Sequence, residues 1–200
     1  MRLRCLTMSA IVALSGCVTV AGNGLHDVEQ RSAPEVPHVE QTVGNYSFHL
    51  DGGKMITSNK AGRILNDEIL GRWKKWHYIT DHVYVPSSKF TGTSEYEVTL
   101  SGTQTGDSSI FLQIVSGLTL CVLPYYVDTR LHVAYDLHNR RTGATYHAEV
   151  DDSYNTVISL LLLPASPFAQ GGRSKTLDRI AGNLYEQLAK QGAFAGAGQP

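Results

Sequence analysis

Two neighbouring segments in the second half of the chain, 127–138 and 144–150, alternate between apolar and polar side chains. A period of two is typical of β-strands that have one buried and one solvated face. The apolar faces consist of Val127, Thr129, Leu131, Val133, Tyr135 and Leu137 in the first segment and of Ala144, Tyr146, Ala148 and Val150 in the second. Because the turn-forming sequence NRRTG lies between them, we predict an antiparallel hairpin with one face in the core.

The register of this hairpin follows from its loop and its apolar faces. A slip of one residue would turn every side chain to the opposite face, so the two apolar faces permit only alternate registers. A tight loop at 139–142 predicts that Arg130 lies opposite Asp151 and that His132 lies opposite Glu149. Each pair joins a basic and an acidic side chain, which stabilises the pairing by about 0.2–1 kcal/mol.

Further elements are predicted on both sides of the hairpin. Strands are expected at 42–50, 78–85 and 94–102, and helices at 59–76 and 175–191, where apolar residues recur every three or four positions. Helices on one face of a mainly antiparallel sheet make an α+β fold, a two-layer sandwich. A chain of 200 residues with 42% apolar content is long enough for one such domain, which we place at 42–192.

The first residues have the organisation of a secretory signal. Arg2 and Arg4 form a basic start, and residues 5–14 are uncharged and mostly apolar. This apolar run is too short to span a bilayer as a stable helix. Small residues follow it and precede Cys17, as a signal peptidase requires.

The tetrapeptide Leu14-Ser15-Gly16-Cys17 resembles the lipobox of bacterial lipoprotein precursors. In that family the cysteine sulfur receives a diacylglyceryl group, the signal is cleaved before the cysteine, and the new amino terminus is acylated, for example with palmitate. The resemblance implies that residues 1–16 are a signal peptide and that Cys17 carries the lipid. Two or three acyl chains make an essentially permanent membrane anchor, since each buried CH₂ contributes about 0.8 kcal/mol.

The same resemblance implies a location in the outer membrane, on its periplasmic face. In that family an Asp after the lipidated cysteine retains the protein in the inner membrane, whereas Val18 follows Cys17 here. Prolines, charges and a lack of periodicity over the next residues predict a flexible tether at 17–41 between lipid and domain. The glycine- and alanine-rich tail, 193–200, is expected to be disordered.

Two apolar segments, 110–123 and 157–163, interrupt the alternating pattern, and a proline follows each. Periodicity cannot assign such short continuous apolar runs, so two interpretations stay open. The segments either pack together in the core, or they form an apolar projection that contacts lipid or a protein partner. In the second case the contact residues would be Ile110, Phe111, Leu112, Ile114, Leu118, Leu120, Leu160, Leu161 and Leu162.

Catalytic and ligand-binding motifs are not found in the sequence, which lacks GxSxG, HExxH, P-loop and GxGxxG patterns. In the predicted register His132 and His138 lie about 20 Å apart along one strand and cannot share an ion, so we expect no metal and no cofactor. Asp151 and Asp152 are interpreted as turn residues and Cys121 as a small buried side chain. The net charge of −1 gives no field that would attract nucleic acid.

We therefore expect a protein without enzymatic activity that is bound to the membrane through the lipid on Cys17. Its apolar segments would bind an envelope protein partner or the membrane, and its organisation resembles small envelope lipoproteins that assist outer-membrane assembly or transport. Two alternatives remain. A hydrolase with an unrecognised site would need a deep polar pocket with converging titratable groups. A carrier of a lipid or other apolar ligand would need a closed apolar cavity of roughly several hundred Å³.

Overall fold

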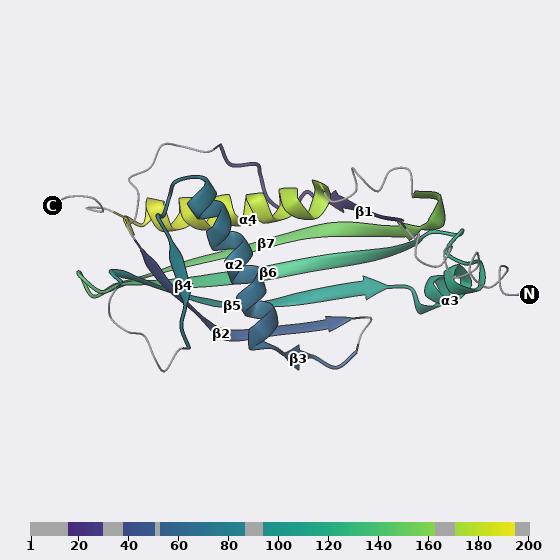
Figure 1. Cartoon of the computed structure of the whole chain (residues 1–200), viewed down its shortest axis with the longest axis horizontal. Helices are drawn as coiled ribbons and strands as arrows, with labels where there is room; N and C mark the ends of the chain where they lie inside the picture. The colour runs from purple at the N-terminus through teal and green to yellow at the C-terminus, as the bar shows by residue number, and fades with distance from the viewer. Residues whose placement is uncertain (1–15, 30–37, 51–52, 87–93, 163–170, 195–200) are drawn as a thin grey trace, which may run out of the picture.

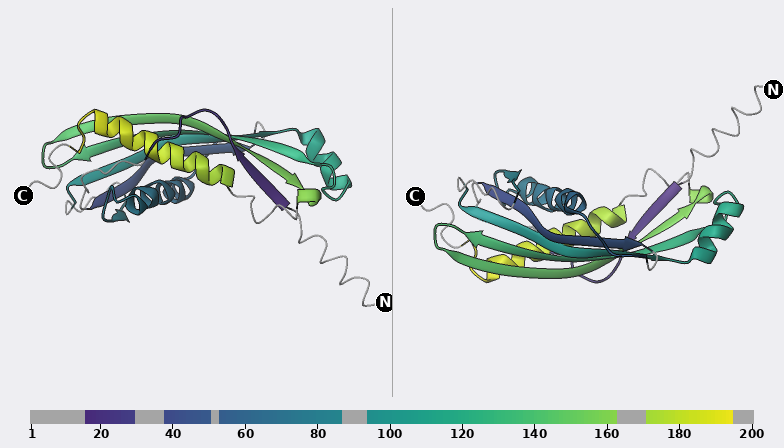
Figure 2. Two further views of the ribbon diagram at one scale, coloured as in Figure 1. Left: turned by 90° about the horizontal axis from the view of Figure 1, so that it is seen from above. Right: turned by 90° about the horizontal axis from the view of Figure 1, so that it is seen from below.

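The computed structural model describes residues 16–29, 38–50, 53–86, 94–162 and 171–194. The elements in chain order are β1 (Gly16–Ala21), β2 (Val39–Leu50), β3 (Ile56–Thr57), α2 (Asn59–Lys75), β4 (His82–Tyr84), β5 (Tyr96–Ser108), α3 (Ile110–Leu118), β6 (Tyr125–Asn139), β7 (Ala144–Ser159) and α4 (Gly171–Lys190). Seven strands form one sheet in the order β1-β7-β6-β5-β2-β3, and β4 also pairs with β2. Helices α2 and α4 lie over one face of the sheet, so the predicted two-layer α+β fold is confirmed (Figures 1 and 2).

The sheet is mainly antiparallel, as predicted, and its parallel pairs all involve β2. The pairs β5–β6, β6–β7, β1–β7 and β2–β3 run antiparallel, whereas β2 runs parallel to β4 and β5. The chain between β2 and β5 passes through α2, which is the kind of helical crossover that parallel neighbours require. This connection places α2 on the same face of the sheet as α4 (Figure 2).

The hairpin β6–β7 has the predicted faces but a different register. Its pairing places Arg130 opposite Ser153 and His132 opposite Asp151, a shift of two residues, so the two predicted cross-strand pairs are wrong. The loop spans 140–143 and closes with Gly143 at φ 72°, a conformation that glycine adopts without strain. Because the shift is even, the predicted apolar face still points into the core.

The core lies between the sheet and the two helices. The predicted stripe of α4, which comprises Leu177, Ile180, Ala181, Leu184 and Leu188, is buried. In α2 the predicted Leu65, Ile69 and Trp73 are buried, whereas Ala61 and Trp76, also predicted on this stripe, are half-buried against the core. The indole Nε1 of Trp73 donates a hydrogen bond to the carbonyl oxygen of Ala181 at 2.8 Å, and its ring packs edge-on against Tyr135 and Tyr185. Trp73 therefore joins α2 to both α4 and β6.

The described part of the segment 17–41 is not a flexible tether. That expectation is wrong for residues 17–29, and also for Val39, Glu40 and Gln41, which are buried in β2. β1 pairs with β7 over its whole length. The residues after β1 lie along α4, where Arg179 donates to the carbonyl oxygen of Gly22 at 2.7 Å and Asn183 to that of His26 at 3.1 Å. These hydrogen bonds fix the backbone, and residues 30–37 lie outside the described residues.

The C-terminal end also differs from the prediction. The helix predicted at 175–191 begins at Gly171 and ends at Lys190, and Gly192 after it has φ 81°, the left-handed conformation expected after a helix. The tail was expected to be disordered from residue 193, which is wrong for Ala193 and Phe194 because both are buried. Phe194 stacks on Tyr185 with ring centroids 4.8 Å apart, so apolar burial holds this end of the chain. Residues 195–200 lie outside the described part.

One buried ion pair joins β7 to α4. The side chains of Arg179 and Asp152 are 6% and 0% exposed, and the guanidinium donates from Nε to Oδ2 and from Nη2 to Oδ1, both at 2.9 Å. Asp151 and Asp152 are not turn residues as predicted, because both lie within β7, which continues to Ser159. A further N–H of Arg179 reaches Gly22, so the pair connects the sheet, α4 and the N-terminal segment.

Glutamine side chains cover the part of the β7 edge that β1 does not reach. Gln187 of α4 accepts from the backbone N–H of Glu149 at 3.1 Å and donates to its carbonyl oxygen at 2.9 Å. Gln191 makes the same two contacts with His147. An open strand edge is a template for pairing with another chain, and these side chains occupy it.

Candidate functional site

One end of the sheet extends beyond the helices. In Figures 1 and 2, α2 and α4 cover one part of the sheet, whereas β5, β6 and β7 continue toward α3. α3 and the turn after it connect β5 to β6 at this end. The first of the two apolar segments therefore lies where neither of the two covering helices reaches.

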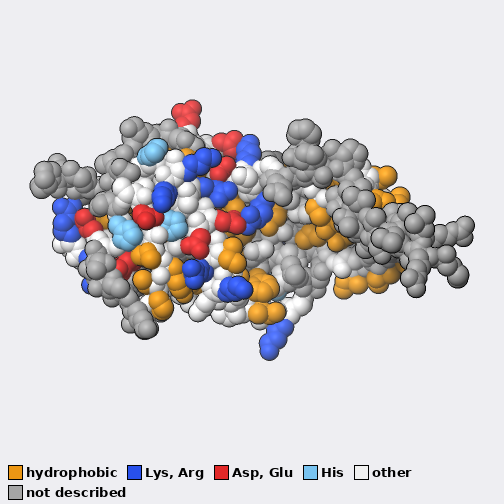
Figure 3. Space-filling model, in the orientation of Figure 1, with side chains coloured by type: hydrophobic (Ala, Val, Ile, Leu, Met, Phe, Trp, Pro, Cys, Tyr) orange, Lys and Arg blue, Asp and Glu red, His pale blue; other side chains and the backbone are white. Residues whose placement is uncertain are grey.

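Apolar side chains at this end are exposed to solvent. Phe111 is 71% exposed, Leu118 80% and Leu161 69%. The exposed set, which we call the apolar end, comprises Ile110, Phe111, Leu112, Ile114, Leu118, Leu120, Val122, Leu123, Tyr126 and Leu161. Figure 3 shows hydrophobic side chains gathered at this end and charged side chains over the helices. Single exposed apolar residues are common, whereas contiguous apolar patches are typical of surfaces that contact lipid or another protein.

Helix α3 turns its polar side chains toward the protein. Ser116 is its buried residue, and its hydroxyl donates to the carbonyl oxygen of Leu123 at 2.7 Å. Gln113 donates to the hydroxyl of Ser108, and Thr119 donates to the carbonyl oxygen of Val115 at 3.0 Å. The surface helices of globular domains bury their apolar stripe instead, so the amphipathicity of α3 is inverted relative to the domain.

The turn after α3 contains two strained residues. Leu120 and Cys121 have φ values of 53° and 61°, a left-handed conformation that costs about 1–2 kcal/mol per residue without glycine. The backbone of Cys121 donates to Ser116 and accepts from Leu160, both at 2.6 Å, which holds the turn in place. The Cys121 side chain is half-buried rather than buried as predicted.

Replacing Leu120 by glycine is expected to stabilise the fold by about 0.5–1 kcal/mol, because relief of the strain exceeds the backbone entropy that glycine adds to the unfolded chain. Urea denaturation would measure the gain. Leu118→Gly is the matched control, since Leu118 is also an exposed leucine but ends a helix, where glycine costs about 1 kcal/mol. Equal losses of stability in both variants would contradict the assigned strain.

Cys17 lies at the same end of the sheet as the apolar end. In the β1–β7 ladder it is opposite Ile158, which is in turn opposite Tyr125 of β6. The next residue of β7, Ser159, donates to the carbonyl oxygens of Cys121 and Val122 at 3.2 and 3.3 Å. The cysteine side chain is exposed. The predicted lipidation position is therefore two strands away from the chain that carries the apolar end.

The structure places the predicted contact residues outside the core. The seven in or near α3 and at position 161 are exposed, whereas Leu160 and Leu162 are half-buried beside the end of β7. The interpretation of 110–123 as a core segment is therefore wrong, and the interpretation as an apolar projection describes its position. That this surface contacts lipid or protein stays a prediction. No helix among the described residues is both long and apolar enough to cross a membrane.

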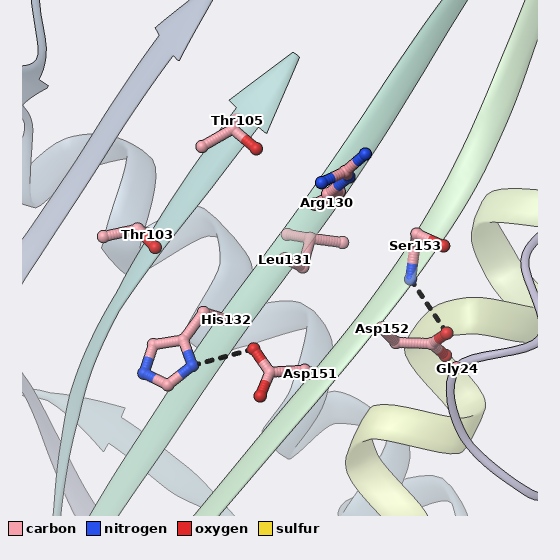
Figure 4. Close-up of a pocket in the computed structure, with 9 residues that line it drawn as sticks. All are labelled: Gly24, Thr103, Thr105, Arg130, Leu131, His132, Asp151, Asp152 and Ser153. Atoms are coloured by element: carbon pink, nitrogen blue, oxygen red, sulfur yellow. Dashed lines mark hydrogen bonds and ion pairs between the residues drawn. The ribbon is translucent and has the colours of Figure 1, made fainter. Parts of the chain in front are cut away.

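The sheet face opposite the helices carries a second group of polar and charged side chains. A hollow of about 260 Å³ is lined by Gly24, Thr103, Thr105, Arg130, Leu131, His132, Asp151, Asp152 and Ser153 (Figure 4). His132 Nδ1 lies 2.9 Å from a carboxylate oxygen of Asp151. Nearby, the hydrogen bond with Asp136 raises the pKa of His147. The predicted register placed Glu149 opposite His132, whereas the observed register places Asp151 there.

No protein-family model matches the sequence, and no curated protein is detectably similar to it. Solved structures with a similar course of the chain include XCC0632 from Xanthomonas campestris, of family DUF330, with a TM-score of 0.40 and 8% identity over 87% of this chain and 93% of that one. A PelC dodecamer from Paraburkholderia phytofirmans has a TM-score of 0.37 and 10% identity over 85% and 96%. A neuraminyllactose-binding hemagglutinin homolog from Helicobacter pylori has a TM-score of 0.39 and 6% identity over 84% and 91%. These similarities to bacterial proteins are distant and provide no residue-level correspondence.

Proposed function

We propose that this chain is a non-catalytic lipoprotein of the bacterial envelope, bound to the membrane by the acyl groups on Cys17, with its apolar end inserted in the same leaflet. The observation that carries the proposal is that Cys17 and the apolar end lie at one end of the sheet. Val18 after the cysteine favours the periplasmic face of the outer membrane. The proposal leaves the helix-covered part of the domain free to bind an envelope protein partner.

The position of Cys17 in β1 determines how close the domain lies to the membrane. Cleavage before Cys17 would leave the acylated residue already paired with β7, with no tether between lipid and sheet. Neighbouring strands are about 5 Å apart, so the ladder through Ile158 brings Tyr125 of β6 within about 10 Å of Cys17. An acyl chain in the bilayer would therefore hold the apolar end at the membrane surface.

The chemistry of the apolar end suits a lipid surface. Residues 108–127 contain no charged side chain and no histidine. Entry into the boundary between headgroups and acyl chains would therefore require no desolvation of charge. Interfacial helices bury their apolar face about 5–10 Å deep in the membrane. The exposed apolar side chains of α3 could be buried to this depth while the rest of the domain stays in water. Since basic residues are missing from this segment, insertion should not depend on anionic lipids.

The lipid anchor is tested by Cys17→Ser in cells labelled with palmitate. We expect this variant to take up no label and to accumulate as an unprocessed precursor, because the thiol that receives the diacylglyceryl group is lost. Cys121→Ser is the matched control and should be labelled and processed like the unaltered protein. Labelling of the Cys17→Ser protein, or absence of label from the unaltered protein, would refute the anchor.

A further inference from the structure

Histidines and carboxylates alternate on the helix-free face of the β6–β7 hairpin. His147 lies 2.8 Å from Asp136 through Nδ1 and 3.6 Å from Glu149 through Nε2. The other oxygen of Glu149 lies 3.7 Å from His132 Nδ1, which lies 2.9 Å from Asp151 Oδ1. The five side chains thus form one continuous row across two strands.

The hairpin register explains this convergence. His132 is directly opposite Asp151, and Glu149 is two residues before Asp151 on the same face of β7. Opposite and diagonal neighbours in a sheet are both within reach of long side chains. Both strands are paired on each side along part of their length, since β6 lies between β5 and β7 and β7 also pairs with β1. The row is therefore built on the backbone of a sheet rather than on a loop.

Three of these side chains bring their donor atoms together. One atom each from His132, Glu149 and Asp151 lies within 4.8 Å of the other two. Donors bound to one Zn²⁺ at about 2.0–2.2 Å in tetrahedral geometry lie about 3.3–3.6 Å apart. We propose that His132, Glu149 and Asp151 bind one divalent transition-metal ion, with Zn²⁺ as the ion that best fits one nitrogen and two carboxylate ligands.

The charges of the site favour a cation. Glu149 and Asp151 place two carboxylates side by side on one strand, and a bound cation would relieve their repulsion. Coordination through Nδ1 would replace the hydrogen bond between this nitrogen and Asp151, and the neutral ring would carry its proton on Nε2. Arg130, on the same face, is paired with Asp128 at 3.2 Å, which offsets its charge near the site.

The hollow beside these residues leaves room for a further ligand. In Figure 4, His132 and Asp151 face each other beside a space that the side chains of Thr103 and Thr105 also border. Three protein ligands and one open position form the arrangement of zinc sites that bind water or a small anion. The site is on the face opposite the helices, so it does not depend on the lipid anchor or on the apolar end.

Titration of the full-length protein in detergent with Zn²⁺, followed by calorimetry, tests the site. We expect one saturable Zn²⁺ per chain and a Kd at least about tenfold weaker in His132→Ala and in Asp151→Asn, since even the loss of a group outside the ligands costs 10–100-fold. His138→Ala is the matched control. His138 is on the same face of β6 but contacts the hydroxyl of Thr145 rather than a carboxylate, so its loss should leave the Kd unchanged.

Three results would overturn the proposal. They are a lack of saturable Zn²⁺ binding, a Kd that His132→Ala and Asp151→Asn both leave unchanged, and complete displacement of Zn²⁺ by excess Ca²⁺, which prefers oxygen ligands. Absorption bands of tetrahedral Co²⁺ in the unaltered protein, lost in His132→Ala, would support it. Asp151→Asn keeps the shape of the side chain, so this variant tests the site even if His132→Ala is poorly folded.

Discussion

The double substitution Phe111→Asp and Leu118→Asp is expected to abolish binding of the domain to lipid vesicles without unfolding it. Both side chains are more than two-thirds exposed, so their replacement removes little packing from the fold. Burial of each in lipid contributes about 1.5–3 kcal/mol, and the pair therefore accounts for at least about a 100-fold change in partitioning. Co-sedimentation of residues 17–200, carrying Cys17→Ser and no signal, with phosphatidylcholine vesicles would measure it.

Ile64→Asp provides the matched control for this experiment. Ile64 is 51% exposed on α2, away from the apolar end, so its replacement should leave vesicle binding unchanged. Raising the salt concentration should also have little effect, because the apolar end carries no charge. Unfolding of the double variant, or vesicle binding equal to that of the parent, would contradict membrane insertion. If the soluble chain without the double substitution does not bind vesicles either, membrane insertion is refuted, and a protein partner becomes the expected occupant of the apolar end.

Arg179→Met is expected to lower the free energy of unfolding by about 3–5 kcal/mol, because it leaves the carboxylate of Asp152 buried without its partner. The same substitution releases the carbonyl oxygen of Gly22 and so weakens the attachment of the N-terminal segment to α4. Urea denaturation of the same soluble chain would measure the loss. It is expected to exceed the effect of any single change among exposed residues.

Two comparisons make this result specific to the buried pair. Arg179→Met combined with Asp152→Leu should recover most of the stability, since two apolar side chains can replace a buried ion pair at little net cost. Arg130→Ala removes an exposed pair with Asp128 and should change stability by less than about 1 kcal/mol. A loss below about 1 kcal/mol in Arg179→Met would show that water reaches Asp152.

Local sequence patterns were sufficient for most elements of the fold. The alternation at 127–138 and the three- and four-residue spacing in α2 and α4 predicted which faces are buried, because side-chain direction follows directly from backbone period. The register of the hairpin was not predictable in the same way. Two registers that differ by two residues bury the same faces, and the geometry of the 140–143 loop decides between them.

The candidate sites also differ in whether local sequence is sufficient to find them. The Cys17 candidate comes from a short linear motif, whereas the His132, Glu149 and Asp151 cluster depends on the pairing of two strands. The observed register places Asp151 directly opposite His132 and Glu149 diagonal to it, the reverse of the predicted arrangement. The apolar segment 110–123 was ambiguous for a similar reason, since a continuous apolar run has the same composition in a core and on a projecting surface.

By itself the sequence determined the fold class and the buried faces, and it supplied the lipobox-like motif on which the proposed anchor rests, since each depends on residues that are neighbours in the chain. Only the tertiary structure decided that 110–123 projects from the domain, that Cys17 lies beside it in β1, and that Arg179 pairs with Asp152. These features join segments that are far apart in sequence. They depend on strand order and register, which are properties of the packed sheet rather than of any local pattern.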